Sequence, residues 1–220
     1  MGKLSIYAVY GASGCGRGIM PLAREQLRRQ GVAPDRLVFV DDGAVDASMN
    51  GQRVLSYADF VAEPAGERHV VLAIANSAVR ERLAARCAAD GVHAWTVVAA
   101  NVLVMDEVVI GEGAALSPFV TLTSNIRIGK HFHANLYSYI EHDCVIGDFV
   151  TFAPGVKCNG NIVIEDHAYI GTGAMIKQGK PGNPLVIGRG AVIGMGAVVT
   201  KDVPAGATVV GNPARIMNKD

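Results

Sequence analysis

Three consecutive polar residues, Glu141, His142 and Asp143, form the group in this chain best suited to proton transfer. A neutral imidazole takes up a proton near pH 7, so His142 is a candidate general base. In the repeat described below, this histidine also occupies a corner from which side chains point outwards. A solvent-exposed histidine without a chemical role is the alternative interpretation.

A glycine-rich turn at residues 11–16, GASGCG, is a candidate anion site. It lies between an apolar strand and a helix, where backbone N–H groups and the positive helix end favour a phosphate. Its spacing, G-x-x-G-x-G, departs from the dinucleotide fingerprint. Asp41 and Asp42 end the next strand, where related folds often hold a ribose or base. Alternatively, the glycines serve only the steric demands of a tight turn, and Asp41 and Asp42 only cap a loop.

Alternating strands and helices position these groups in the first hundred residues. Apolar runs predict strands at 5–10, 37–40, 69–75 and 94–97, and helices at 17–29 and 78–90. This order is typical of a small parallel α/β unit. We therefore expect a Rossmann-like domain over residues 1–100, followed by a second domain over residues 101–220.

A six-residue period runs through the second half of the chain and places His142. Neither the helical period of 3.6 nor the strand period of 2 explains it. A hexapeptide repeat predicts a parallel β-helix in which residues 18 apart stack. The period is kept by apolar residues at Val104, Ile110, Leu116, Leu122, Ile128, Ala134, Ile140, Ile146, Phe152, Cys158, Ile164, Ile170 and Ile176.

The period breaks once, after Ile176, because the next in-frame aliphatic residue is Ile187. The intervening segment 177–184, KQGKPGNP, is too rich in glycine and proline for a buried coil, so we expect a loop outside the coil. Loops of repeat proteins often lie on the binding face. In the repeat register, Ser124 stacks above His142 and Gly160 below it, which predicts a groove with little bulk beneath the candidate base.

Composition narrows the functional classes. The 20 basic and 20 acidic residues cancel, and no basic run is present, so nucleic acid and anionic membranes are poor candidates for partners. No apolar stretch is long enough for a membrane span, and the N-terminus does not resemble a signal peptide. The four cysteines form no metal or disulfide pattern, and Cys144 and Cys158 are expected to be buried thiols. These features favour a cytoplasmic protein.

Taken in order, the motifs resemble the left-handed β-helix acetyltransferases that act on nucleotide sugars in bacterial glycan biosynthesis. The likeness is greatest to those that N-acetylate UDP- or GDP-linked 4-amino-4,6-dideoxy sugars, which are grouped with the sialic acid O-acetyltransferases. It covers nearly the whole chain. The motifs that carry it are YGASGCG at 10–16, FVDD at 39–42, AIANS at 73–77, IEHDCVIG at 140–147, GVKCNGN at 155–161 and VGNPARI at 210–216.

The resemblance implies a homotrimer that uses acetyl-CoA as acyl donor, with His142 as the catalytic base and Asp143 orienting and activating its imidazole. It also implies that acetyl-CoA binds beside the coil between subunits. The cofactor contacts it implies are Thr151, Thr172 and Met195. The implied contacts for the nucleotide sugar are Ser13, Gly14, Asp41, Asp42, Asn76 and Val79. No metal is implied.

Departures from the family pattern leave alternatives open. Thr151 replaces a histidine that contacts the cofactor in relatives, and Cys15 replaces a histidine in the glycine-rich turn. The 177–184 segment is longer than in relatives, and its Lys177 and Lys180 are candidates for binding the CoA phosphates.

Two alternative functions stay open. One is O-acetylation of a sugar such as sialic acid, which needs the same base. A non-catalytic β-helix binding subunit is the remaining alternative.

Overall fold

A computed structural model describes residues 5–44 and 46–217 of this chain. The chain divides into two units, one of residues 1–100 with 112–115 and one of residues 101–111 with 116–220. Among the described residues, no helix is both long enough and apolar enough to cross a membrane.

The first unit is built on a sheet of strand order β3-β4-β2-β1-β5-β6. Its strands are β1 (Ile6–Tyr10), β2 (Leu37–Val40), β3 (Ser48–Met49), β4 (Gln52–Leu55), β5 (Arg68–Leu72) and β6 (His93–Ala94). Its other elements are α1 (Gly14–Arg29), a 3₁₀ turn (Pro34–Arg36), α2 (Tyr57–Ala62), α3 (Ser77–Ala89) and β7 (Val97–Val98). The expected order of strands and helices is confirmed, except that the single strand expected at 94–97 is replaced by two short strands, β6 and β7.

The sheet is mixed, whereas the sequence predicted a purely parallel one. β3 and β4 form an antiparallel hairpin at its edge, and neither these strands nor α2 was expected. Asn50 and Gly51 connect the hairpin with positive φ angles of 50° and 75°, as Asn-Gly does in two-residue hairpin turns. The hairpin was missed because its strands are too short to show a period.

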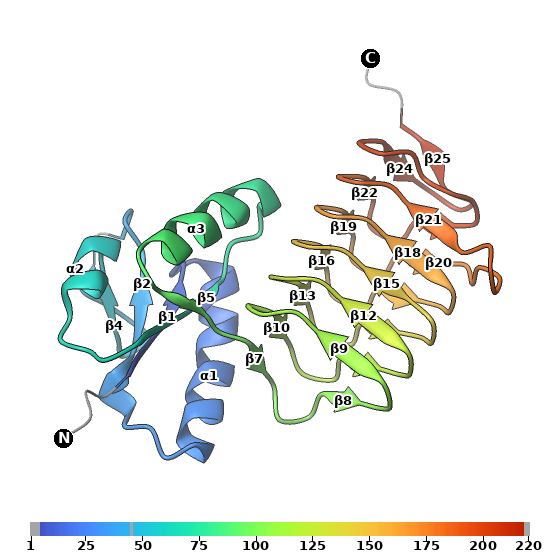
Figure 1. Cartoon of the computed structure of the whole chain (residues 1–220). Coiled ribbons are helices and arrows are strands. Elements are labelled where there is room, and N and C mark those ends of the chain that lie inside the picture. The colour runs from blue at the N-terminus through green and yellow to red at the C-terminus, as the bar shows by residue number, and fades with distance from the viewer. Residues whose placement is uncertain (1–4, 45, 218–220) are drawn as a thin grey trace. The chain divides into compact units, whose positions relative to one another are not determined.

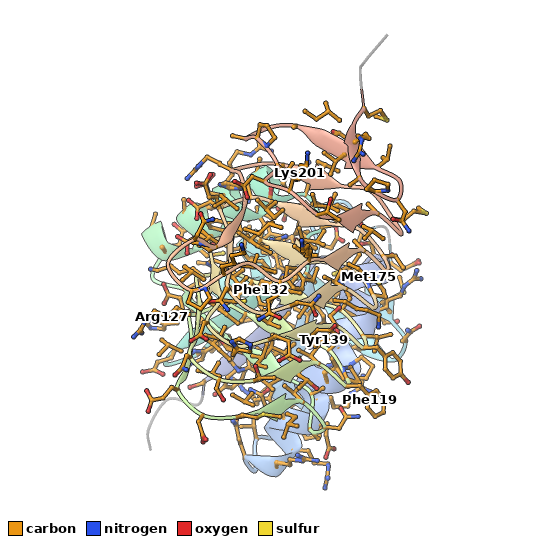
Figure 2. All side chains as sticks on the ribbon, turned by 90° about the vertical axis from the view of Figure 1, so that its right-hand side faces the viewer. Phe119, Arg127, Phe132, Tyr139, Met175 and Lys201 are labelled. Carbon is orange, nitrogen blue, oxygen red and sulfur yellow. The ribbon has the colours of Figure 1, made fainter. Side chains whose placement is uncertain are left out.

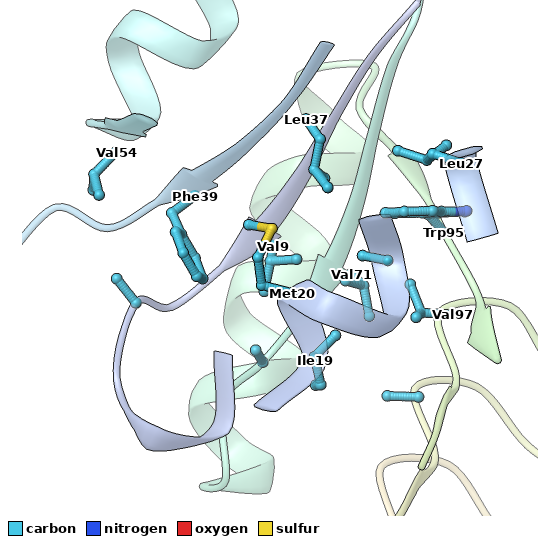
Figure 3. Close-up of a cluster of buried hydrophobic side chains, with 14 residues drawn as sticks. Val9, Ile19, Met20, Leu27, Leu37, Phe39, Val54, Val71, Trp95 and Val97 are labelled. Atoms are coloured by element: carbon cyan, nitrogen blue, oxygen red, sulfur yellow. The ribbon is translucent and has the colours of Figure 1, made fainter. Parts of the chain in front are cut away.

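Apolar side chains alternate between the two faces of this sheet and fill two cores. Val9, Phe39 and Val71 pack with Met20 and Leu27 of α1 on one face (Figure 3). The other face has a second core with residues from β1, β2 and β5, Tyr57 and Phe60 of α2, and Cys87 of α3. Burial on both faces explains why these strands read as continuous apolar runs. It also fixes the carboxyl ends of β2, β1 and β5 side by side.

The second unit is a β-helix of stacked short strands (Figure 1). One sheet contains β10 (Ala115–Leu116), β13 (His133–Ala134), β16 (Thr151–Phe152), β19 (Tyr169–Ile170), β22 (Val192–Ile193), β24 (Thr208–Val210) and β25 (Arg215–Ile216). The second contains β8 (Leu103–Val104), β11 (Thr121–Leu122), β14 (Tyr139–Ile140), β17 (Lys157–Cys158), β20 (Met175–Ile176) and β23 (Val198–Val199). The third contains β9 (Val108–Ile110), β12 (Ile126–Ile128), β15 (Val145–Ile146), β18 (Ile162–Ile164) and β21 (Leu185–Ile187).

Residues 18 apart pair in parallel register, which confirms the β-helix predicted from the six-residue period. Ile128 pairs with Ile146, and Ile140 pairs with Cys158. From Leu116 onwards the inward side chains are almost fully buried, and the thiols of Cys144 and Cys158 are buried too, as expected, whereas Val104 in the first coil is 43 % exposed. Three sheets joined by tight corners thus enclose one apolar column.

The corners require left-handed backbone at their fourth position. His131, Asp143 and Phe149, for example, have φ angles of 52°, 57° and 58°. His131 and His167 lie at equivalent corners and stack on the two sides of Phe149, with ring centroids 5.1 and 5.3 Å away. His131 is only 5 % exposed, so the three stacked rings form an aromatic column that keeps this side chain from solvent.

The loop expected at the break in the period is confirmed as a small hairpin. Ile164 pairs with Ile187, 23 residues on, whereas Ile146 pairs with Ile164, 18 residues on. The extra residues lie in segment 177–184, where Lys180 and Asn183 form an antiparallel bridge around Pro181-Gly182. Gly182 has a φ of 73°, which fits the third position of a type II turn with proline before it.

Candidate active site

The candidate base is held by the corner between β14 and β15. Ile140 and Cys144 point into the coil, which leaves Glu141, His142 and Asp143 at the corner. Hydrogen bonds to the neighbouring coils fix the backbone: Asp143 N–H donates to Ser124 O at 3.1 Å, and Asn161 N–H donates to His142 O at 3.0 Å. The outward corner position predicted for His142 is therefore present, with Ser124 in the coil before it.

The imidazole of His142 is oriented by its neighbour. His142 Nδ1 lies 2.7 Å from Asp143 Oδ2, and Asn125 Nδ2 donates to Asp143 Oδ1 at 3.3 Å. An ionised carboxylate only accepts hydrogen bonds, so this contact favours the proton on Nδ1. The lone pair of the neutral ring is then on Nε2, the atom that can take a proton from a substrate. The two side chains are 44 % and 50 % exposed, so a substrate can reach them.

The next coil makes room for this ring because residue 160 is glycine. A Cβ built at Gly160 would lie 2.6 Å from both Nε2 and Cε1 of His142. Contacts that short do not occur, so no larger residue fits while the ring keeps this position. The space predicted beneath the base, at Gly160, is present, but the imidazole of His142 itself fills it. Nε2 therefore faces along the corner towards Gly160.

The three residues expected to contact the cofactor lie away from His142. Thr172 and Met195 share the corner that precedes β20 and β23, and Gly196 N–H donates to Thr172 O at 2.8 Å. Met195 is 82 % exposed. Thr151 pairs with His133 and Tyr169 on the neighbouring sheet and is only 6 % exposed, so it offers a ligand little surface.

One sheet separates the cofactor corner from the base corner within the chain. In each coil, the cofactor corner precedes the strands of the β8-β11-β14-β17-β20-β23 sheet, and the His142 corner follows them. Tyr139 and Met175 lie on the outer face of that sheet (Figure 2). The structure thus brings Thr172 and Met195 together and His142 and Asp143 together, but it does not join the two pairs.

In the first unit, the nucleotide-sugar candidates gather at the carboxyl ends of β1, β2 and β5, which are neighbouring strands. Ser13 caps α1 through its backbone, and its side chain makes no capping bond, so the exposed hydroxyl is available. Gly14 begins the helix. Gly16 is required sterically, since a Cβ there would overlap Gly11 O at 1.7 Å. The turn thus places the N-terminus of α1, where backbone N–H groups favour an anion, directly after β1.

Both aspartates of the acidic pair have structural partners. Asp41 accepts from Ala12 N–H at 2.8 Å and from Gly43 N–H at 2.9 Å, and so ties the glycine-rich turn to the end of β2. Asp42 accepts from Tyr57 N–H at 2.7 Å and from Tyr10 O–H at 3.0 Å. The bond from Tyr57 N–H holds the pKa of Asp42 below its usual value.

Asn76 caps α3, because its Oδ1 accepts from Val79 N–H at 3.0 Å, which leaves its amide N–H groups for a ligand. The loop before it is fixed by Arg80, a residue that sequence reasoning missed. Arg80 is fully buried, and its Nη1 donates to Ile74 O at 2.7 Å. Burial lowers the pKa of Arg80 to about 10, so it is still charged at neutral pH. No period or motif marks an arginine as buried.

A β-helix with an outward histidine–aspartate pair, following a small α/β unit, defines the class of hexapeptide-repeat acyltransferases. No family model matches the chain. It is 50 % identical over 216 residues to the GDP-perosamine N-acetyltransferase of Escherichia coli O157:H7, covering 98 % of each chain. The chain belongs to the hexapeptide-repeat N-acetyltransferases of nucleotide sugars.

Solved structures agree with this placement. WeeI from Acinetobacter baumannii AYE is 60 % identical, with a TM-score of 0.94 over 97 % of this chain and 100 % of that one. The acetyltransferase domain of PglB from Neisseria gonorrhoeae FA1090, in complex with acetyl coenzyme A, is 27 % identical, with a TM-score of 0.86 over 98 % and 100 %. The chain is thus an acetyl-CoA-dependent N-acetyltransferase of a nucleotide-linked 4-amino-4,6-dideoxy sugar. This identity decides against the O-acetylating and non-catalytic alternatives.

Proposed function

We propose that this enzyme transfers the acetyl group of acetyl-CoA to the sugar amine of GDP-perosamine. The support for this acceptor is the 50 % identity, over 98 % of both chains, to the enzyme of that name. The observation that carries the chemistry is the His142–Asp143 pair, with Nδ1 held by the carboxylate and Nε2 facing Gly160.

In the proposed mechanism, the amine nitrogen attacks the thioester carbonyl while His142 Nε2 accepts the proton that the nitrogen loses. Asp143 keeps the ring in the reactive tautomer and stabilises the imidazolium that forms. A backbone N–H beside the carbonyl stabilises the oxyanion. When the C–S bond breaks, the imidazolium returns the proton to the departing CoA thiolate, and the base is restored.

Transfer is proposed to be direct, without an acetyl-enzyme. Cys144 is the thiol nearest to His142 along the chain, but it is fully buried in the coil. Its Sγ donates a hydrogen bond to Asn159 O at 3.3 Å. A nucleophile has to reach the thioester carbonyl, and this one cannot without opening the coil.

We propose that the active site is shared between the subunits of a trimer. Within one chain, a whole sheet lies between the His142 corner and the corner of Thr172 and Met195. Acetyl-CoA bound at the second corner can meet a base only if a neighbouring subunit presents it. Mixed trimers of His142→Ala and Met195→Arg subunits should therefore regain activity that neither variant has alone. An active monomer in sedimentation would contradict the shared site.

We further propose that residues 1–100 hold the nucleotide, and that the enzyme works in the cytoplasm. The candidate contacts are the Ser13 hydroxyl, the N–H of Gly14, the Asn76 amide with Val79 beside it, and the acidic pair. Asp41 and Asp42 keep lone pairs beyond the contacts described above, because each carboxylate accepts about four hydrogen bonds. Both therefore remain able to accept hydrogen bonds from a base or ribose.

The acceptor is tested by measuring release of the CoA thiol from acetyl-CoA with a panel of amino sugars linked to GDP, UDP, dTDP and CMP. We expect the highest kcat/KM with GDP-perosamine and formation of the amide product. Equal or faster turnover with another nucleotide would reject the proposed acceptor while leaving the family assignment intact.

A further inference from the structure

The hairpin at 177–184 is attached to the coil directly below the candidate base. Gly179 N–H donates to Gly160 O at 3.0 Å, and Leu185 N–H donates to Asn161 O at 3.2 Å. Gly160 is the residue against which the His142 ring lies. The hairpin therefore starts and ends on the corner that carries the base, on the side that Nε2 faces.

Short-range contacts hold this hairpin in one place. Lys180 N–H donates to Asn183 O at 3.1 Å, and Asn183 N–H donates back to Lys180 O at 2.9 Å. The stem is packed closely, because a Cβ at Gly179 would lie 2.1 Å from Asn161 O. The lysines of the hairpin are thus presented from a defined backbone.

Three lysines gather around a hollow beside this hairpin. Lys177, Lys180 and Lys201 line a space of about 170 Å³, together with a single carboxylate, that of Asp202. Asp202 Oδ1 is already engaged by Val186 N–H at 2.9 Å. Within residues 5–44 and 46–217, none of the three lysines makes an ion pair. A chain of zero net charge thus concentrates positive charge at one concave place, which favours an anionic ligand.

The hollow and the base belong to the same corner. Ile140, Cys158, Ile176 and Val199 pair in successive coils, so His142, Gly160, Gln178 and Lys201 follow one another along the corner. Lys201 lies in the last coils of the β-helix (Figure 2). With about 4.8 Å between coils, Lys201 is about 14 Å along the axis from His142. A ligand with a reacting group at one end and an anionic group at the other can contact both.

We propose that Lys177, Lys180 and Lys201 bind the phosphate groups at the adenosine end of CoA, while its thioester lies at His142. This inference rests on the proposed function of His142. It gives the hairpin a role in holding the acyl donor on the subunit that supplies the base, while in the proposed trimer the Thr172 and Met195 corner of the neighbouring subunit contacts the same donor.

The test uses Lys177→Gln, Lys180→Gln, Lys201→Gln and the triple variant in the full-length enzyme. Lys130→Gln is the matched control, because Lys130 is an exposed lysine in the corner between β12 and β13. Exposed ion pairs contribute modestly, so each single variant should raise KM for acetyl-CoA by about two- to fivefold, and the triple variant by about tenfold or more. The kcat at saturation and the KM for the nucleotide sugar should not change.

Two comparisons make the test specific to phosphate. S-acetylpantetheine lacks the adenosine phosphates, so the triple variant should use it as well as the wild type does. Raising the salt concentration should raise KM for acetyl-CoA in the wild type and much less in the triple variant. An unchanged KM for acetyl-CoA in the triple variant would overturn the proposal, and so would a rise in the KM for the nucleotide sugar alone.

Binding of adenosine 3′,5′-bisphosphate, measured by calorimetry, tests the hollow independently of catalysis. The wild type and Lys130→Gln should bind it, and the triple variant should bind about tenfold more weakly or not at all. Equal binding by all three overturns the assignment even if turnover follows the proposed chemistry. Loss of turnover in His142→Ala with unchanged bisphosphate binding separates the two proposals.

Discussion

Replacing Gly160 by alanine should remove the base from the active site without touching His142 itself. The new methyl group would lie 2.6 Å from Nε2 and Cε1 of the ring, which no structure tolerates. Gly160 is not among the residues with positive φ, and the three atoms nearest to a Cβ at this position all belong to His142. The backbone therefore accepts alanine, and the imidazole has to move.

The sizes of the rate loss and of the fall in stability depend on where the displaced ring can move. Restoring ordinary contact distances requires a shift of about 1 Å, and misplacement of a catalytic group by that much costs about 10²-fold in rate. Since the side chain of His142 is 44 % exposed, the ring can rotate into solvent at the loss of its bond to Asp143. Losing that bond costs about 0.5–1.5 kcal/mol. For a chain of this size, the melting temperature should fall by only about 1–6 °C.

The assay is steady-state release of CoA thiol, with thermal melting on the same preparations. Gly160→Ala should lose about 10²-fold or more in kcat/KM, and should remain folded. In the double variant with His142→Ala, the added methyl should have no further effect on rate or melting, because the ring that it would strike has gone. Near-wild-type turnover in Gly160→Ala would refute the reasoning, as would additive losses in the double variant.

Three further outcomes follow from the contacts. Asp143→Asn should lower kcat/KM by about tenfold or more and displace the pH–rate profile, because the ring loses the carboxylate that fixes its tautomer. If the pH–rate profiles of the variant and the wild type coincide, Asp143 is only a surface residue. Arg80→Met leaves the carbonyl of Ile74 without its donor and should destabilise the fold by about 1–3 kcal/mol, raising KM for the nucleotide sugar but not for acetyl-CoA; an equal rise in both would show a general defect. The pKa of Asp42 is depressed in the folded state, so the stability that its ionised form contributes is present at neutral pH and is lost as pH falls through its protonation. Denaturant midpoints of the wild type and Asp42→Asn should therefore differ near pH 7 and converge below about pH 4; a gap that stays constant would contradict the shift.

The β-helix was predictable because its geometry imposes one inward side chain in every six residues. Ile128, Ile140 and Ile146 keep that period whatever the outward residues are. The alternation of strands and helices in the first unit was predictable for a similar reason, since its buried strands are continuous apolar runs. The β3-β4 hairpin was not, although Asn50-Gly51 marks its turn, because strands of two and four residues are too short to show a period.

The candidate site was predictable only in part. The outward corner of His142 followed from the repeat, and the neighbour Asp143 from the chain order. The contact between Gly160 and the ring, and the bond from Asn125 to Asp143, depend on how adjacent coils stack and on side-chain rotamers. The burial of Arg80 depends on packing between elements distant in sequence, which no local pattern records.

The central claim, that His142 is the general base for acetyl transfer, is tested most directly by the kinetics of His142→Asn and His142→Ala. Thiol release from acetyl-CoA would be measured with GDP-perosamine across the pH range, with sedimentation and melting to confirm the fold. We predict a loss of about 10²–10⁴-fold in kcat/KM with assembly unchanged, and loss of the pH dependence assigned to the imidazole. A correctly folded variant with near-wild-type kcat/KM would contradict the account.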